Sequence, residues 1–449
     1  MQGSVPSPSD VQATFAATLL DEWIRCGLRE VVIGPGSRST PLALAAAERT
    51  ELTLHVRIDE RSAAFFALGR ALVRAQPVAI VVTSGTAAAE LHAALCEADL
   101  AGVPLLALTA DRPPELHGVG APQTIDQRNL YGSAVRLYEE PGVARLEAAP
   151  SWRDLASRLW FAAIGVSNKP GPVHLNVAFV EPLLGAPLEL PPGRINGAAW
   201  RTTSVPESRV AALDVHGARV LCVVGAGVDA GVVATCRDLD WVVVGDATAQ
   251  GTLPYWDPLL RDDDFASAQR PDLVVRMGGL PASKVLATRL REWGVPVVAL
   301  RGAGDVADPE GVVTKSLAGL PRRDSSSMRA DSTYVESWYA ASSSVGEYLR
   351  SQEADDDELN EPMVARTLVE LSGENEVALI VGSSMPVRDV EWWAGSRRSP
   401  TFANRGVNGI DGVVSTVLGV SAGARGIGLV GDLTMLHDVS GLVDGLGSA

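Results

Sequence analysis

Four polar clusters in the first 125 residues carry the side chains best suited to chemistry. Each cluster follows an apolar run: residues 35–41 (PGSRSTP), 57–61 (RIDER), 83–87 (TSGTA) and 110–114 (ADRPP). Apolar strands that end in Gly, Ser, Thr and Arg are typical of a parallel α/β sheet with a ligand crevice along its carboxyl edge. The sequence therefore predicts a binding site made of loops that follow consecutive strands.

One acid in these clusters, Glu60, stands between the strand-like run 52–58 and the apolar helical stretch 62–68. A strand-to-helix junction should hold its carboxyl partly away from water, and desolvation raises the pKa of a carboxyl. A carboxyl in such a place can keep a proton ready for transfer near neutral pH. The simpler alternative is that Glu60 pairs with Arg57 or Arg61, which is a common fate of surface charges.

The arginines inside the motifs are informative because the chain as a whole is acidic, with a net charge of −16 and an isoelectric point near 4.9. This charge argues against nucleic acid and anionic membranes as partners, because phosphate binding needs a basic surface. Arginine presents a planar donor fork that suits carboxylates. A receptor for di- or tricarboxylic substrates could therefore be formed by Arg38, Arg112, Arg388 and Arg405. Any one of them alone would more simply be a solvated surface residue.

Other catalytic chemistries find less support. Residues 83–87 contain no histidine to act as a base, which argues against a serine hydrolase. His55, His117 and His437 have no second His or Cys at ligand spacing, so packing or hydrogen bonding is the simpler interpretation. The four cysteines are scattered without Cys-x-x-Cys spacing, and we expect them to be buried, reduced thiols.

The helices and strands that must position the clusters can be predicted from the apolar runs and from the residues that interrupt them. With 449 residues, of which 46% are hydrophobic, the chain is long enough for about three domains. Residues 1–190 alternate helical stretches with β-rich runs, which predicts a doubly wound α/β domain. The polar stretch 194–208, which follows several prolines, predicts a linker.

A second domain is predicted at residues 209–345, where four β-rich runs indicate a Rossmann-like sheet. Its glycine turn at residues 224–231 (VGAGVDAG) differs from a dinucleotide fingerprint in the spacing of the last glycine, so we expect a tight turn that binds no nucleotide. Ser-rich and acidic stretches are interpreted as solvated linker at residues 324–327, 342–344 and 355–358.

A third domain is predicted at residues 355–449. It begins with a helical pattern at 361–371 and continues through a loop at 383–388 to a strand at 427–432. That strand is expected to be buried and to end in Gly431 and Asp432. A carboxylate at the end of a buried strand is a suitable hard oxygen ligand for Mg²⁺.

Membrane insertion and export find no support in the sequence. No run is long and apolar enough to span a bilayer. Residues 1–10 contain no basic segment leading into a signal-like apolar stretch. We therefore expect a cytoplasmic protein.

The four clusters, in their order, resemble the pyrimidine-binding domain of thiamin diphosphate enzymes. More narrowly, they resemble the SEPHCHC synthase (2-succinyl-5-enolpyruvyl-6-hydroxy-3-cyclohexene-1-carboxylate synthase) family of menaquinone biosynthesis. The resemblance lies in residues 35–42 (PGSRSTPL), 59–61 (DER), 109–116 (TADRPPEL), 384–388 (SMPVR), 404–411 (NRGVNGID) and 431–434 (GDLT). It implies an α/β fold of three consecutive doubly wound parallel-sheet domains: pyrimidine-binding, Rossmann-like middle and diphosphate-binding.

The resemblance implies a decarboxylating carboligase, a transferase that adds the succinyl-semialdehyde unit of 2-oxoglutarate to isochorismate with release of CO₂. The implied cofactors are thiamin diphosphate and Mg²⁺ or Mn²⁺, with Glu60 exchanging a proton with the aminopyrimidine ring. The positions that match substrate-binding residues are Ser37, Arg38, Arg112, Gln123, Lys284, Ser384, Arg388 and Arg405. The positions that match cofactor-binding residues are Ile410, Gly431 and Asp432, and Asp432 matches the metal ligand.

The resemblance also bears on assembly and completeness. It implies a homodimer or homotetramer in which Glu60 of one subunit meets a cofactor anchored by Asp432 of its neighbour. An Asn-rich metal-binding turn should follow Asp432, and the sequence given stops at Ala449 without one, so we expect a truncated third domain. Two alternatives stay open: another 2-oxo-acid enzyme, similar to acetolactate synthase, and an inactive truncated pseudoenzyme. The several arginines favour polyanionic substrates over pyruvate.

Overall fold

The structure, a computed structural model, groups the chain into two compact units. The first unit comprises residues 1–205, 411–422 and 435–449, and the second comprises residues 206–410 and 423–434. The described residues are 6–166, 169–203, 211, 213–301, 307–322, 326–355 and 358–445. The end of the predicted linker, the predicted start of the second domain at 209, and parts of the stretches at 324–327 and 355–358 lie outside them.

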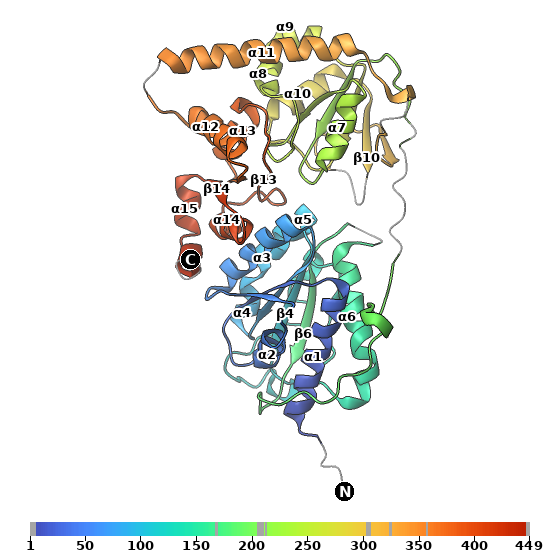
Figure 1. The fold of residues 1–449 in the computed structure, drawn as a ribbon, viewed down its shortest axis with the longest axis vertical. Helices are drawn as coiled ribbons and strands as arrows, with labels where there is room; N and C mark the ends of the chain where they lie inside the picture. The colour runs from blue at the N-terminus through green and yellow to red at the C-terminus, as the bar shows by residue number, and fades with distance from the viewer. Residues whose placement is uncertain are drawn as a thin grey trace. The chain divides into compact units, whose positions relative to one another are not determined.

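The first unit contains a six-stranded parallel sheet of order β2-β1-β3-β4-β6-β5 (Figure 1). Its strands are β1 (Glu30–Ile33), β2 (Thr53–Val56), β3 (Val78–Val82), β4 (Leu105–Asp111), β5 (Tyr138–Glu139) and β6 (Val173–Ala178). Successive side chains of a strand point to opposite faces. Val31 and Val81 accordingly belong to one core, and Val32 and Ile80 to the other. Because both faces are buried, the predicted doubly wound sheet is confirmed.

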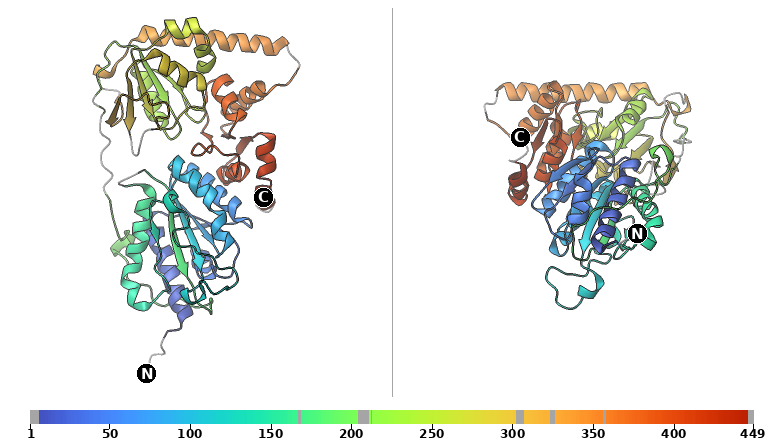
Figure 2. Two further views of the ribbon diagram at one scale, coloured as in Figure 1. Left: turned by 180° about the vertical axis from the view of Figure 1, so that it is seen from behind. Right: turned by 60° about the horizontal axis from the view of Figure 1, so that its bottom comes forward.

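Helices cover both faces of this sheet, as the two views of Figure 2 show. One face packs against α1 (Pro8–Cys26), α2 (Thr40–Ala47) and α6 (Ala149–Ile164). The other face packs against α3 (Glu60–Arg74), α4 (Thr86–Glu90) and α5 (His92–Ala101). Each of β1, β2 and β3 therefore leads through a short turn into a helix, and the first three polar clusters lie at these turns. The fourth cluster, residues 110–114, lies at the end of β4.

Helix α3 is held on its outer side by α14 (Val413–Ser421). A Cβ added to Gly69 would lie 2.5 Å from the carbonyl oxygen of Thr416, and one added to Gly419 would lie 2.2 Å from that of Phe66. Only glycine permits such an approach of two backbones. Arg70 strengthens the contact, since it donates to the carboxylate of Glu30 at 2.6 Å and to the carbonyl of Gly419 at 3.1 Å.

The second unit contains a five-stranded parallel sheet of order β11-β10-β9-β7-β8. Its strands are β7 (Val220–Val224), β8 (Val242–Gly245), β9 (Leu273–Met277), β10 (Val297–Arg301) and β11 (Lys315–Ala318). One face packs against α7 (Ala230–Asp238). The other packs against α8 (Trp256–Arg261), α9 (Asp263–Ala268), α10 (Lys284–Trp293) and α11 (Ser332–Asp355).

A third, small parallel sheet of order β13-β12-β14 also belongs to the second unit. Its strands are β12 (Ala378–Val381), β13 (Thr401–Phe402) and β14 (Gly426–Leu429), and it packs against α12 (Glu361–Glu374) and α13 (Met385–Trp393). The last helices are α15 (Asp432–His437) and α16 (Ser440–Gly445). The three parallel sheets with flanking helices confirm the predicted α/β fold, and the third sheet is small.

Four local predictions differ from the structure. Ser342, in the predicted linker 342–344, lies inside α11 and is buried, with its hydroxyl donating to the carbonyl of Pro254 at 2.8 Å. Residue 345, the predicted end of the second domain, also lies inside α11. Residues 385–388 are not loop but the first turn of α13. The strand predicted to be buried at 427–432 is the edge strand β14, which ends at Leu429 and is partly exposed because a neighbouring strand covers only one side.

None of the helices in the described part of the chain combines the length and the apolar character that a membrane crossing requires.

Candidate active site

Glu60 is the first residue of α3, four residues beyond the end of β2. The carboxylate of Asp59 caps the helix by accepting from the backbone N–H of Ser62 at 2.7 Å. Glu60 itself is half-buried. Burial raises the pKa of its carboxyl, and the negative charges of Asp59 and Glu90 act in the same direction. The predicted strand-to-helix junction and the partial desolvation of Glu60 are therefore confirmed.

The side chain of Glu60 reaches back over the end of β1, where Gly34 makes room for it. A Cβ added to Gly34 would lie only 3.3 Å from Cγ of Glu60. The neighbouring arginines have contacts elsewhere: Arg61 pairs with Asp438 at 3.5 Å, and the guanidinium of Arg57 lies 4.0 Å from the ring centre of Phe66. These contacts weaken the alternative in which Glu60 merely forms a surface ion pair.

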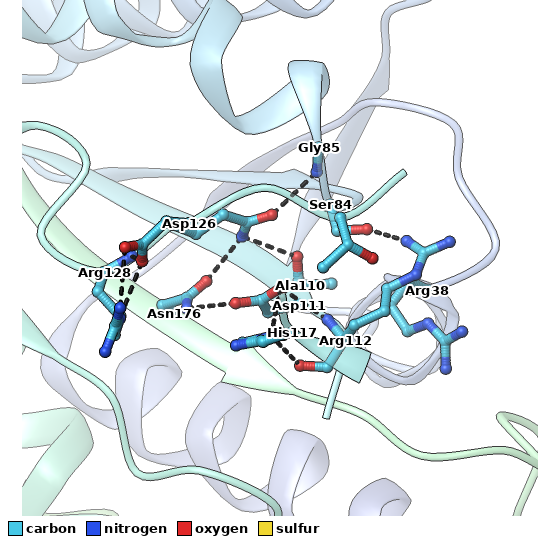
Figure 3. A network of polar contacts seen from close by, with 12 residues as sticks. Arg38, Ser84, Gly85, Ala110, Asp111, Arg112, His117, Asp126, Arg128 and Asn176 are labelled. Carbon is cyan, nitrogen blue, oxygen red and sulfur yellow. Dashed lines mark hydrogen bonds and ion pairs between the residues drawn. The ribbon is translucent and has the colours of Figure 1, made fainter. Parts of the chain in front are cut away.

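Three predicted residues, Arg38, Arg112 and Gln123, come together with Ser84, which was not predicted, beyond the carboxyl ends of β1, β3 and β4. We call these four residues the arginine cluster. Nη1 of Arg112 donates to Oγ of Ser84, and its Nη2 donates to Oε1 of Gln123 at 3.4 Å. Ser84 in turn donates to the carbonyl of Gln123 at 3.0 Å. Figure 3 shows Arg38 and Arg112 side by side next to Ser84. The structure thus brings together three of the residues predicted from separate motifs.

The two guanidinium groups of the arginine cluster are close enough to influence each other. Arg38 is 7% exposed and donates to the carbonyl of Phe179 and to the carboxylate of Glu181, both at 3.0 Å. Burial lowers the pKa of Arg112, and the positive charge of Arg38 lowers it further. Two cations held this close favour an anion between or beside them.

A network that includes buried amides adjoins the arginine cluster, and Figure 3 shows its members Asn176 and Asp111 beside Arg112. Gln127 accepts from the backbone N–H of Gly85 at 2.9 Å and donates to Oδ1 of Asn176 at 2.8 Å. Asn176 donates to Asp111 at 2.9 Å, and Asp111 accepts from the backbone N–H of Arg112 at 2.7 Å. This network ties the ends of β3, β4 and β6 together. Sequence reasoning missed it, because no motif marks Gln127 or Asn176.

In the second unit, Arg405 lies in an ion pair that the sequence did not indicate. Its Nε donates to Oδ2 of Asp246 at 2.8 Å, its Nη2 donates to the carbonyl of Leu280 at 3.1 Å, and its Nη1 donates to Oδ1 of Asn408. Asp246 follows β8 and is fully buried. Leu280 lies in the loop between β9 and α10, so Arg405 joins two loops at the carboxyl edge of the five-stranded sheet.

Glu391 of α13 is a second buried carboxyl beside this pair. It is fully buried, and its Oε2 accepts from the backbone N–H of Ala282 at 2.8 Å. Burial and the negative charge of Asp246 raise the pKa of Glu391 to about 8, against the opposing influence of Arg405 and Arg397. The shift favours the protonated form of Glu391. It fixes the same loop that Arg405 holds through Leu280.

The other predicted residues of the second unit are more exposed. Lys284 is the exposed first residue of α10, directly after the loop held by Arg405 and Glu391. Ser384 precedes α13 with a positive φ of 73°, and it is exposed. Arg388 is half-buried, with Nη1 3.9 Å from the sulfur of Met385. Ser384 and Arg388 therefore lie at the start of the helix that also carries Glu391.

The predicted cofactor-binding positions lie near β14 and the 404–411 segment. Asp432 begins α15 with an exposed carboxylate, and its Oδ1 accepts from the backbone N–H of Leu433 at 2.8 Å. Gly431 and Ile410 are half-buried. Within the described ranges, no group of three or more His, Cys, Asp or Glu side chains is placed to hold a metal ion. Asp432 thus offers a single accessible carboxylate.

The predicted residues are distributed over both units. Glu60, Arg38, Arg112 and Gln123 belong to the first unit, as does Ser37, which is exposed at the turn before α2. The second unit contains Lys284, Ser384, Arg388, Arg405, Ile410, Gly431 and Asp432. A direct contact links Arg112 with Gln123 in the first unit, while in the second unit Arg405 donates to Leu280, in the loop that precedes Lys284.

Comparison with known proteins places this geometry in a family. Residues 13–130 match the model of the thiamine pyrophosphate enzyme N-terminal TPP binding domain. The 2-succinyl-5-enolpyruvyl-6-hydroxy-3-cyclohexene-1-carboxylate synthase of Thermobifida fusca is 40% identical, over 96% of this chain and 81% of the relative. The proteins of that name from Saccharopolyspora erythraea and Thermosynechococcus vestitus are 38% and 36% identical, over 98% and 96% of this chain and 81% and 80% of their own. The chain therefore belongs to the 2-succinyl-5-enolpyruvyl-6-hydroxy-3-cyclohexene-1-carboxylate synthase family of thiamine pyrophosphate enzymes.

Proposed function

We propose that this protein joins 2-oxoglutarate to isochorismate with loss of CO₂, which gives SEPHCHC in menaquinone biosynthesis. The observation that carries the proposal is Glu60, a half-buried acid with a raised pKa at the start of α3. It lies inside the segment that matches the thiamine pyrophosphate domain, and relatives at 36–40% identity bear the name of this synthase.

The residues of both units fit thiamin diphosphate and a divalent metal. The partly desolvated carboxyl of Glu60 can hold a proton and donate it to a ring nitrogen. The accessible carboxylate of Asp432 suits Mg²⁺ or Mn²⁺, which prefer oxygen ligands. When bound, thiamin diphosphate supplies the carbon nucleophile and electron sink that a decarboxylating carboligation needs. Glu60 would keep the aminopyrimidine ring in the protonation state that this chemistry requires.

The arginines suit the two substrates, both of which carry two carboxylates. We assign Ser37, Arg38, Arg112 and Gln123 to substrate carboxylates and hydroxyls on the side of the first unit. Lys284, Ser384, Arg388 and Arg405 have the same role in the second unit, and Ile410 and Gly431 border the cofactor. The rigid fork of a guanidinium held by neighbouring hydrogen bonds, as in Arg112 and Arg405, is suited to bidentate contact with a carboxylate.

We also propose that the active form is a homodimer or homotetramer, with Glu60 and Asp432 contributed to each site by different subunits. Sedimentation velocity with and without thiamin diphosphate and Mg²⁺ tests this assembly. A monomer that forms product at the same specific activity over a wide concentration range would contradict it.

The decisive experiment compares Glu60→Gln with the unaltered protein in an assay of SEPHCHC formation with Mg²⁺ and excess thiamin diphosphate. The amide cannot exchange a proton, so we expect product formation to fall by about 100-fold or more, the usual contribution of acid–base catalysis. Calorimetry should show cofactor binding within about 10-fold, since the amide keeps the shape of the acid. Glu51→Gln, the same change at an exposed position before β2, is the matched control and should change neither result.

Each other outcome of this experiment points to an alternative. Consumption of pyruvate in preference to 2-oxoglutarate would indicate an acetolactate synthase-like enzyme. Failure of the unaltered protein to bind thiamin diphosphate would indicate a pseudoenzyme. Full activity of Glu60→Gln would remove Glu60 from the catalytic role.

A further inference from the structure

Each of the three guanidinium nitrogens of Arg405 donates a hydrogen bond to a protein group. Nε donates to Asp246, Nη2 to Leu280 and Nη1 to Asn408. A guanidinium has five N–H bonds. Since three of them are taken by described residues, one N–H on each Nη remains for a ligand. Nη1 and Nη2 form one edge of the planar guanidinium, the kind of edge from which a carboxylate can accept two hydrogen bonds.

Asp246 is itself held so that only one of its oxygens is used by Arg405. Its Oδ1 accepts from the backbone N–H of Thr248 at 2.8 Å and from the hydroxyl of Thr248 at 2.6 Å. Its Oδ2 is left for Nε of Arg405 at 2.8 Å. Because each carboxylate oxygen has a separate hydrogen-bonding partner, the side chain of Asp246 cannot rotate without losing one of them.

Arg397 holds the turn that carries Asp246 through hydrogen bonds to its backbone. This buried arginine donates to the carbonyls of Asp246 at 3.2 Å and Ala249 at 3.1 Å. Gly245, just before the turn, permits a close approach to β7, since an added Cβ would lie 2.5 Å from the carbonyl oxygen of Val224. The backbone on both sides of Asp246 is therefore tied to its surroundings.

These contacts support a role for a residue that is not among the assigned site residues. We propose that Asp246 is a positioning residue, whose buried carboxylate orients Arg405 so that its two free N–H groups meet a substrate carboxylate. The inference rests on the proposed function, because it presumes that Arg405 binds a dicarboxylate substrate. Asp246 does not touch the substrate and acts only through Arg405.

A positioning ion pair differs from a purely structural one in the properties that change when the pair is removed. A structural pair contributes to folding, and its removal lowers the melting temperature without selecting one kinetic constant. A positioning pair also changes the affinity for the group that Arg405 holds. The two roles are therefore separated by comparing substrate affinity, turnover and stability in the same variant.

The test replaces Asp246 by Asn in the full chain with thiamin diphosphate and Mg²⁺. The amide oxygen is similar in size but uncharged, so it holds Nε of Arg405 weakly. We expect KM for 2-oxoglutarate or isochorismate to rise by about 10-fold or more while kcat changes by less than about 3-fold, a loss of ground-state binding. An unchanged KM for both substrates would overturn the proposal.

Glu22→Gln is the matched control. Glu22 is also fully buried and accepts from an arginine, Arg153, at 3.1 Å, but it belongs to α1 of the first unit. The control removes the same buried charge, so its melting temperature should fall as that of Asp246→Asn does. Its KM values should stay unchanged. If Glu22→Gln raised KM as much as Asp246→Asn does, the effect would be one of general destabilisation and the proposal would be wrong.

A double mutant tests whether Asp246 acts through Arg405. In Arg405→Lys, the Nε–H that Asp246 accepts is absent. Adding Asp246→Asn to Arg405→Lys should therefore raise KM by less than about 2-fold beyond the single Lys variant, since residues in one network are not additive. Full multiplication of the two effects would show that Asp246 acts on the substrate by another route, and the proposal would fail.

A readout that needs no activity separates this proposal from the proposed function. The ¹⁵N signal of the Arg405 Nε–H, assigned by its loss in Arg405→Lys, should exchange with solvent about 10-fold or more faster in Asp246→Asn, because the buried acceptor is weakened. If the protein forms no SEPHCHC, the proposed function is wrong, and this signal still decides whether Asp246 fixes Arg405. An unchanged exchange rate would show that it does not.

Discussion

The arginine cluster of the first unit and the Asp246–Arg405 pair of the second unit hold arginines by opposite means. In the cluster, Arg38 and Arg112 lie close together, and burial together with Arg38 lowers the pKa of Arg112. Arg38 pairs with Glu181, whose carboxylate is exposed, while Ser84 and Gln123, the side chains that accept from Arg112, carry no charge. In the second unit, Arg405 is neutralised by a carboxylate that is fully buried.

The two arginine sites therefore differ in how their charges affect ligand binding and folding. Like charges held together cost free energy in the empty site, which is recovered when an anion binds. A buried ion pair is already satisfied, so its arginine gains orientation rather than excess charge. We therefore expect the cluster to govern affinity for anionic substrates with little effect on folding, and the pair to contribute to both folding and binding.

The largest effect on stability should come from Arg405→Ala. The change leaves the buried carboxylate of Asp246 without its cation, a situation that costs roughly 3 kcal/mol in other proteins. The melting temperature should fall by several degrees in differential scanning calorimetry. Asp246→Ala combined with Arg405→Ala should recover part of the loss. An unchanged melting temperature in Arg405→Ala would remove the contrast between the two regions.

A smaller effect, dependent on pH, should come from Glu391→Gln. Its pKa is raised from an ordinary 4.5 to about 8 by burial and by Asp246, while Arg405 and Arg397 oppose the shift. The folded protein therefore binds a proton that the unfolded chain releases, so the stability from this group is complete below about pH 4.5 and is lost as the pH rises towards 8.

Glutamine cannot ionise, so the melting temperature of the unaltered protein should fall relative to that of Glu391→Gln as the pH is raised from about 5 to about 8. Thermal unfolding at a series of pH values measures this difference. Glu370→Gln, at an exposed position of α12, is the control and should show no such slope. Parallel pH curves for Glu391→Gln and the unaltered protein would mean that Glu391 ionises normally.

The smallest effect on stability should come from Arg112→Gln. Its removal relieves repulsion with Arg38 and leaves no buried carboxylate without a partner, so the free energy of unfolding should change by less than about 0.5 kcal/mol. KM for at least one substrate should still rise by about 10-fold or more. Arg128→Gln, which breaks an exposed pair with Asp126, is the control for both measurements. A large loss of stability in Arg112→Gln would make the cluster a folding element like the pair.

Much of the fold was predictable because its signals are local. The sheet of the first unit was predicted from β-rich runs that are followed by helical stretches after a few residues. The same pattern placed Glu60 at a strand-to-helix junction. Helix α13 was missed although Pro386 lies in its first turn, a position that favours a helix start. Ser342 was misread because serine is rare in helix interiors, and its burial depends on the distant carbonyl of Pro254.

The sequence by itself determined that the polar clusters of the first unit follow strands and that Glu60 lies at the junction between β2 and the helix after it. These features depend on apolar periodicity and on neighbours within a few positions. Only the tertiary structure decided which charges meet. Asp246 and Arg405 are 159 positions apart, and no motif marks Asp246. Such a pair forms because the turn after β8 and the segment after β13 meet when the second unit folds, and the cost of burying each charge then selects its partner.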